Sequence, residues 1–251
     1  MKHFYKPALV LFFVTVAASV QATLLYYDGF PVTVANAYPV DRVANNANPQ
    51  HASIVGFKDN SANIWRAGST AIRISNNNLE PPTAIKLAAQ DGCFSVGEGS
   101  GNPRAGFRNI VSPALTGTTY YSFLVKYKGT FPEKFTNVFV SFDTIGVQGT
   151  ASPDLNTFGE NGFVVAFVRQ DSSRVDLVLK TDTDMLPLVE NASAGETYMV
   201  VAKYVNNPDD VHEVMASIIT EPIEPETWDA AITTPERSQT INKMCIGGFG
   251  A

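Results

Sequence analysis

Three glutamates form a cluster of carboxylates that could act as an acid and a base: Glu221, Glu224 and Glu226. Two carboxyl groups about 5 Å apart can protonate a glycosidic bond and attack the sugar. A Glu-x-Asp pattern on a strand would place such a pair on one face, but the chain contains no such pattern. The three glutamates stand in the proline-rich stretch EPIEPE, which favours a solvated loop over a catalytic pair.

Asp182 and Asp184 could bind calcium, because Ca²⁺ prefers carboxylate and carbonyl oxygens. The glycine and the distal glutamate of an EF-hand loop are missing, so that kind of site is excluded. A looser structural calcium site and ordinary turn residues are the two alternatives. His212 and Glu213 begin like a zinc-protease motif, but Ala216 stands where the second histidine belongs. We therefore expect no zinc site and no cofactor other than such a calcium ion.

Three aromatic residues are candidates for binding a carbohydrate: Trp65, Tyr120 and Trp228. An aromatic ring gives apolar contact to a pyranose ring, while amides and carboxylates satisfy the sugar hydroxyls. Tyr120 stands on the more polar face of its predicted strand. The alternative for both tryptophans is that they pack under loops, where a large ring buries much apolar surface.

The chain contains two cysteines, Cys93 and Cys245. In an oxidising compartment an even pair predicts one disulfide, which would close a long loop and restrict the unfolded chain. The alternative is two buried thiols that behave as small hydrophobic side chains.

The elements that must position these residues are short strands, because apolar and polar residues alternate with a period of two. In the segment 174–180, Val175, Leu177 and Leu179 are expected to point inward, and Arg174, Asp176 and Lys180 outward. The segment 163–168 is apolar on both faces, so we expect a central strand there. The predicted strands are 24–27, 71–74, 84–87, 93–96, 107–110, 119–127, 137–143, 163–168, 174–180, 197–204, 212–219 and 241–246.

Only the segment 226–232 (ETWDAAI) is expected to form a helical turn or two. About a dozen short strands with almost no helix are typical of a sandwich or a jelly roll. The predicted fold class is therefore all-β, a two-sheet antiparallel sandwich, and a closed barrel is the less favoured alternative.

The first 22 residues read as a secretory signal peptide: a positive start, an apolar run, and small residues before Thr23. The apolar run is shorter than the roughly 20 residues that a membrane-spanning helix needs, and an uncleaved anchor is the alternative. We expect residues 23–251 to form a single domain that is secreted, or held at the cell surface or in the periplasm, with no membrane span after cleavage.

The net charge of −6 becomes −8 when Lys2 and Lys6 leave with the signal peptide. Nucleic acids need clustered lysine and arginine to neutralise their phosphates. This acidic balance argues against nucleic acid and against anionic lipid surfaces as partners.

Four segments resemble one family of secreted bacterial proteins: LYYDGF (25–30), GTTYYSFLV (117–125), TYMVVAK (197–203) and INKMCIGG (241–248). The family is common in Verrucomicrobia and Planctomycetes and is similar to concanavalin A-like (laminin G-like) jelly rolls. The resemblance implies two antiparallel sheets, one of them concave, and carries no catalytic signature. Many relatives continue into a further strand and a PEP-type sorting tail, whereas this chain stops at Ala251.

These observations favour a non-catalytic secreted β-sandwich that binds polysaccharide or belongs to the cell envelope or matrix. The first alternative is an assembly subunit that associates with itself through an exposed sheet edge, since an unpaired edge invites another chain. The second is a polysaccharide-active enzyme with an unfamiliar site.

Overall fold

The structure is a computed structural model, and it describes residues 66–67, 72–75, 79–85, 93–96, 105–109, 117–129, 136–143, 155, 162–182, 184–206, 211–234, 241 and 243–249. Thirteen strands form these parts of the chain, and every strand pair is antiparallel. The fold is therefore an all-β sandwich of two antiparallel sheets, as the sequence predicts.

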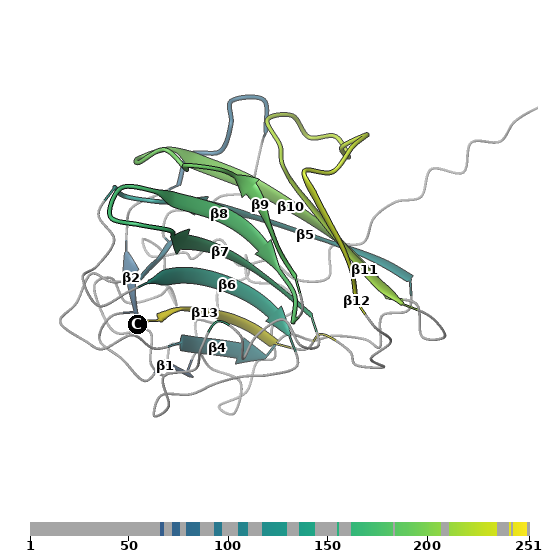
Figure 1. The fold of residues 1–251 in the computed structure, drawn as a ribbon, viewed down its shortest axis with the longest axis horizontal. Helices are drawn as coiled ribbons and strands as arrows, with labels where there is room; N and C mark the ends of the chain where they lie inside the picture. The colour runs from purple at the N-terminus through teal and green to yellow at the C-terminus, as the bar shows by residue number, and fades with distance from the viewer. Residues whose placement is uncertain are drawn as a thin grey trace, which may run out of the picture.

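The larger sheet has seven strands in the order β1-β4-β13-β6-β7-β8-β9 (Figure 1). The last predicted strand, 241–246, corresponds to β13, which lies between β4 and β6. The strands are β1 (Arg66–Ala67), β4 (Ala105–Asn109), β6 (Asn137–Asp143), β7 (Phe163–Arg169), β8 (Val175–Lys180), β9 (Met185–Val189) and β13 (Lys243–Phe249).

The second sheet has four strands in the order β12-β11-β10-β5, and a separate hairpin pairs β2 with β3. Strands β9 and β12 contact each other, so the two large sheets meet along that side. The strands are β2 (Ile72–Ser75), β3 (Cys93–Val96), β5 (Gly117–Lys126), β10 (Thr197–Asn206), β11 (His212–Ile218) and β12 (Ala230–Thr234).

The core lies between the two sheets and is built around aromatic rings. The centroid of the Tyr121 ring lies 4.6 Å from that of Phe142 and 5.0 Å from that of Phe163. Leu177 and Leu179 of β8 are fully buried beside them. Because β5, β6, β7 and β8 each contribute side chains from one face, their period-two pattern reflects burial against the opposite sheet.

A second apolar cluster covers the other face of the seven-stranded sheet. It contains Phe139, Val164, Ala166, Val178 and Cys245, and Leu155 packs with them. Strand β7 is thus buried on both faces, with β6 and β8 as its neighbours. This confirms the prediction of a central strand at 163–168.

Two charged side chains of β8 correct the expected inward–outward pattern. Asp176 and Lys180 leave the inter-sheet core as predicted, but they are 4% and 5% exposed instead of solvated. Asp176 accepts two hydrogen bonds of 2.9 Å from the Arg174 guanidinium and one of 2.8 Å from the backbone N–H of Asn191. Lys180 donates from Nζ to the carbonyl oxygen of Thr181. Buried charges persist only where such partners exist.

Two predicted elements are wrong in the described residues. The expected helical turn at 226–232 is a loop followed by β12, because Ala230 and Ile232 point into the core and pair alongside β11. The expected strand at 84–87 begins as a turn, in which the N–H of Ile85 donates to the carbonyl oxygen of Pro82 at 2.8 Å. The predicted strand at 24–27 lies outside the described residues, as does the signal segment.

No helix within the described ranges has the length and apolar character needed to cross a bilayer.

Candidate functional site: an aromatic cluster around Lys203

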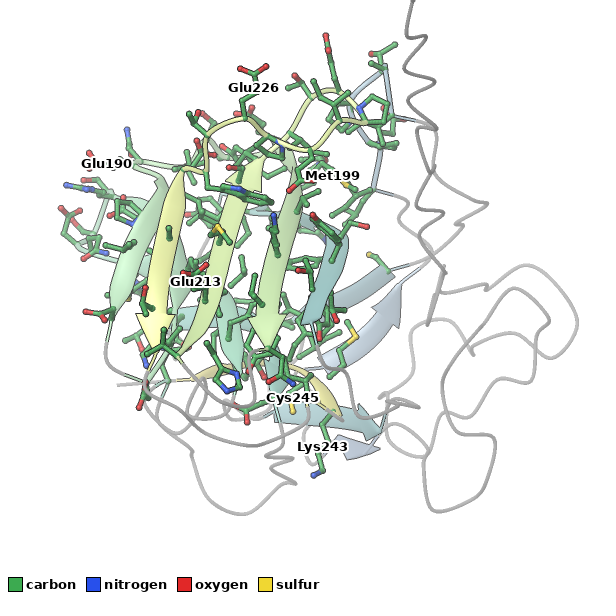
Figure 2. All side chains as sticks on the ribbon, turned by 90° about the vertical axis from the view of Figure 1, so that its right-hand side faces the viewer. Glu190, Met199, Glu213, Glu226, Lys243 and Cys245 are labelled. Carbon is green, nitrogen blue, oxygen red and sulfur yellow. The ribbon has the colours of Figure 1, made fainter. Side chains whose placement is uncertain are left out.

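The outer face of the four-stranded sheet carries the residues that form the candidate site, and Figure 2 shows this face toward the viewer. Tyr120, Ser122 and Lys126 point outward from β5, and all three are exposed. On β10, Lys203 stands directly opposite Tyr120 in the strand register. Because paired residues of neighbouring strands lie on the same face, these side chains share one surface.

A loop covers part of this surface and completes the site. Residues 219–229, which we call the β11–β12 loop, connect β11 to β12. At its base, the carboxylate of Asp229 accepts a 2.9 Å hydrogen bond from the N–H of Ile218, and the Asp229 N–H donates to Ser217 Oγ at 2.8 Å. Met199 is only 4% exposed although it faces outward from β10, and its carbonyl oxygen accepts a 2.9 Å hydrogen bond from the N–H of Ile219 at the start of this loop.

The ammonium group of Lys203 is the centre of the site. Its Nζ donates to Glu224 Oε1 at 2.8 Å. The same nitrogen lies 5.6 Å from the centroid of the Tyr120 ring and 5.9 Å from that of the Trp228 ring. Both distances fall within the range at which a cation is attracted to the face of an aromatic ring. We call these four residues the Lys203 cluster.

The charges in the Lys203 cluster are fixed at neutral pH. The hydrogen bond to Glu224 raises the pKa of Lys203. Hydrogen bonds from Lys203 and Tyr120 lower the pKa of Glu224. Burial raises the pKa of Tyr120, and its hydrogen bond to Glu224 raises that pKa further. The cluster therefore holds one positive and one negative charge beside two neutral rings, and its net charge is zero.

Two of the three aromatic candidates meet in this cluster. Tyr120 is 46% exposed and Trp228 is half-buried. The side chain of Trp65 lies outside the described residues. The sequence did not point to Lys203, and Glu224 was considered only as one of three loop glutamates, not as a partner of the aromatic residues. A lysine within the apolar run of β10 was the available signal for Lys203, whereas nothing in the sequence predicts which strand residue Glu224 contacts.

The three glutamates of the EPIEPE stretch lie in the β11–β12 loop, and all are exposed. This confirms the prediction of a loop. Only Glu224 forms a described ion pair, whereas the side-chain carboxylates of Glu221 and Glu226 have no described partner. No two of these carboxylates are held together as an acid and a base.

The residues considered for metal binding or a disulfide lie elsewhere. Asp182 and Asp184 follow β8, and the N–H of Thr181 donates to the Asp184 carbonyl oxygen at 2.9 Å. In the part of the chain that the structure describes, no three His, Cys, Asp or Glu side chains are grouped to hold a metal ion. Cys93 and Cys245 are both buried, as thiols and not as a disulfide.

Tyr204 and His212 form a buried polar pair at the edge of the core, near the start of β11. The hydroxyl of Tyr204 lies 2.8 Å from His212 Nδ1, and the two residues are 5% and 1% exposed. Burial, and then the charge of Asp143, raises the pKa of Tyr204 to about 12. The tyrosine hydroxyl therefore keeps its proton, and the imidazole tautomer of His212 sets the direction of the hydrogen bond between the hydroxyl and Nδ1. Because a sugar or peptide cannot reach these buried atoms, the pair stabilises the fold and is not our candidate site.

The chain matches no protein-family model and no curated protein sequence. A proposal about its function therefore rests on the geometry of the Lys203 cluster.

Proposed function

We propose that this protein is a non-catalytic, secreted β-sandwich that binds polysaccharide through the Lys203 cluster. One observation carries the proposal: the rings of Tyr120 and Trp228 flank the same ammonium group on an accessible sheet face. These rings come from residues 108 positions apart in the chain, and both were candidates on sequence grounds.

The chemistry of the cluster suits a sugar. Ring faces give apolar contact to the C–H face of a pyranose, and polar groups beside them fix its orientation. Lys203 can donate to a sugar hydroxyl and Glu224 can accept from one. Since their charges cancel, the cluster favours an uncharged glycan over a uronic acid or a sulfated chain.

The site is also suitably rigid. Lys203, Tyr120 and Glu224 hold one another, and the base of the β11–β12 loop is fixed at Asp229. Rigid side chains lose little entropy on binding, which favours affinity. The signal-like N-terminus and the resemblance to secreted jelly-roll proteins support the same assignment, because an extracellular protein meets polysaccharides.

Affinity electrophoresis tests the proposal against β-1,4-glucan, β-1,3-glucan, β-1,4-xylan and β-1,4-mannan. At least one of these polysaccharides should retard the protein. The double variant Tyr120→Ala/Trp228→Ala should lose about tenfold or more in affinity, as expected for central aromatic residues. Met185→Ala, an equally exposed apolar residue on the other sheet, should bind normally. If the polysaccharide retards the double variant as strongly as the unmodified protein, the proposed site is wrong. Cleavage of the polysaccharide would contradict the non-catalytic role.

A second function, self-association through a sheet edge, is favoured by β5. It is an edge strand of the four-stranded sheet and pairs with β10 over all ten of its residues. It contains no proline and has one charge, at its end, so its own sequence lacks these two usual protections of an edge strand. Light scattering after size exclusion tests this function, and a monomer at high concentration would contradict it.

A further inference from the structure

The outward side of β5 continues beyond Tyr120 as an accessible strip. Ser122 is exposed, Leu124 is half-buried and Lys126 is exposed. In the register with β10, Lys126 stands opposite Thr197, just as Tyr120 stands opposite Lys203. These pairs therefore lie on the same face of the sheet, at two points along one straight pair of strands.

A polar hollow lies at the Lys126 end of this strip. Its volume is about 460 Å³, and Glu80, Thr83, Lys126 and Thr197 contribute to its lining. The Pro81–Pro82 turn forms one wall, held by the hydrogen bond from the Ile85 N–H to the Pro82 carbonyl oxygen. Lys126 forms no ion pair with any residue that the structure describes. The hollow thus offers an ammonium group, a carboxylate and hydroxyl groups to a ligand.

The separation of the Lys203 cluster from the hollow follows from the strand. Tyr120 and Lys126 are six positions apart along the strand, so the span is ~20 Å, or about four pyranose units of an extended chain. A single sugar or a disaccharide at the Lys203 cluster could not reach the hollow. A linear chain that follows β5 would contact both.

We infer that the ligand is a linear polysaccharide that lies along β5, with the Lys203 cluster and the polar hollow as two ends of one site. This inference rests on the proposed function and adds to it the shape and minimum length of the ligand. Sugar rings pack on Tyr120 and Trp228 at one end, and hydroxyl groups bind Lys126, Thr197 and Glu80 at the other. A branched or highly curved glycan does not fit the straight strip.

Calorimetry with a series from disaccharide to hexasaccharide, prepared from each of the four polysaccharides, tests the inference. For the unmodified protein, affinity should rise with the length of the oligosaccharide and level off at about the tetrasaccharide, which is long enough to span the ~20 Å strip. The variant Lys126→Ala/Thr197→Ala should bind the hexasaccharide about tenfold less tightly and the disaccharide with unchanged affinity, since only the longer sugar loses two polar partners in the hollow. Tyr120→Ala should weaken both.

Glu213→Gln is the matched control, because Glu213 is exposed on the same sheet face but lies beyond the Tyr120 end of the strip. Thermal unfolding of every variant checks that the fold is retained. Equal affinity for disaccharide and hexasaccharide would overturn the inference and leave the proposed function standing. The same holds if Lys126→Ala/Thr197→Ala binds the hexasaccharide normally. If no sugar of any length binds, the proposed function fails as well.

Discussion

At the scale of single residues, an ion pair between Arg174 and Asp176 shows how near neighbours in the sequence become specific partners in the structure. Arg174 and Asp176 are predicted to be outward-facing residues of one strand, and they form a two-point ion pair. Asp176 is nearly buried while Arg174 stays partly exposed, at 6% and 44% of their side-chain surfaces. The pair therefore closes the end of β8 and also fixes the turn at Asn191.

The variant Asp176→Asn should destabilise the protein by about 1–3 kcal/mol at neutral pH, because charge-assisted hydrogen bonds are lost in a buried place. Burial alone would raise the pKa of Asp176, but the hydrogen bonds from Arg174 and Asn191 outweigh it, so the pKa is lowered. A carboxylate with a lowered pKa stabilises the fold above its unfolded pKa and loses this effect as the pH falls through the folded value.

Urea unfolding at neutral pH and below about pH 3 measures this difference. The difference in the free energy of unfolding between the natural protein and the variant should shrink at acid pH. Ser172→Ala in the same exposed hairpin is the control. An equal difference at both pH values would contradict the role of the Asp176 charge.

Only some residues of the Lys203 cluster could be predicted from the sequence. Tyr120 and Trp228 were predicted because an aromatic ring signals apolar contact wherever it lies. Lys203 and Glu224 were not, because their pairing requires the β5–β10 register and the return of the β11–β12 loop across two strands. Neither is encoded in local spacing.

At the scale of elements, the strands with strong period-two patterns were predicted within a few residues. The strands that were not predicted are β1, which is only two residues long, β9 and β12. Strand β9 contains Pro187, which argues against a strand but is tolerated at a sheet edge. Strand β12 begins with two alanines, which favour a helix, and pairing with β11 overrides this local preference. Tertiary pairing thus decides the structure where the local signal is weak.

The β11–β12 loop is held differently at its base and at its tip. Glu224→Gln should leave the free energy of unfolding nearly unchanged, because exposed ion pairs contribute little. It should nevertheless accelerate amide hydrogen exchange at residues 221–226, since the tip loses its charged contact with Lys203. Asp229→Ala should accelerate exchange at the base as well, at Ile218 and Asp229.

Hydrogen exchange followed by mass spectrometry distinguishes the two ends of the loop, with Glu221→Gln as the control for a nearby glutamate that has no described partner. Unchanged exchange at the tip of Glu224→Gln would mean that the Lys203 cluster does not hold the loop in place.

At the scale of the whole molecule, the sequence predicted the two-sheet sandwich correctly, because alternation along many strands demands two buried inner faces. It did not predict the second apolar cluster, which buries the outer face of the seven-stranded sheet as well. A strand that is apolar on both faces indicates that a cover exists but does not say which segment provides it.

The whole sandwich should lose stability at alkaline pH through Tyr204. The folded-state pKa of about 12 exceeds the ordinary value of 10. The unfolded chain therefore releases this proton first, and the stabilisation that is complete below pH 10 declines as the pH rises toward 12. Over this window the loss should be ~1–3 kcal/mol, because one unit of pKa shift corresponds to 1.36 kcal/mol.

Tyr204→Phe removes this alkaline decline and, at neutral pH, costs about 1–3 kcal/mol because His212 Nδ1 loses its buried hydrogen-bond partner. Denaturant unfolding between pH 8 and 12 measures both effects. A residual decline should remain in the variant, because burial also raises the pKa of Tyr198. Tyr127→Phe, which leaves the Tyr204–His212 pair intact, should retain the full decline. If Tyr204→Phe also shows the full alkaline decline in stability, the decline comes from another group. The pKa of Tyr204 would then not be raised by its surroundings.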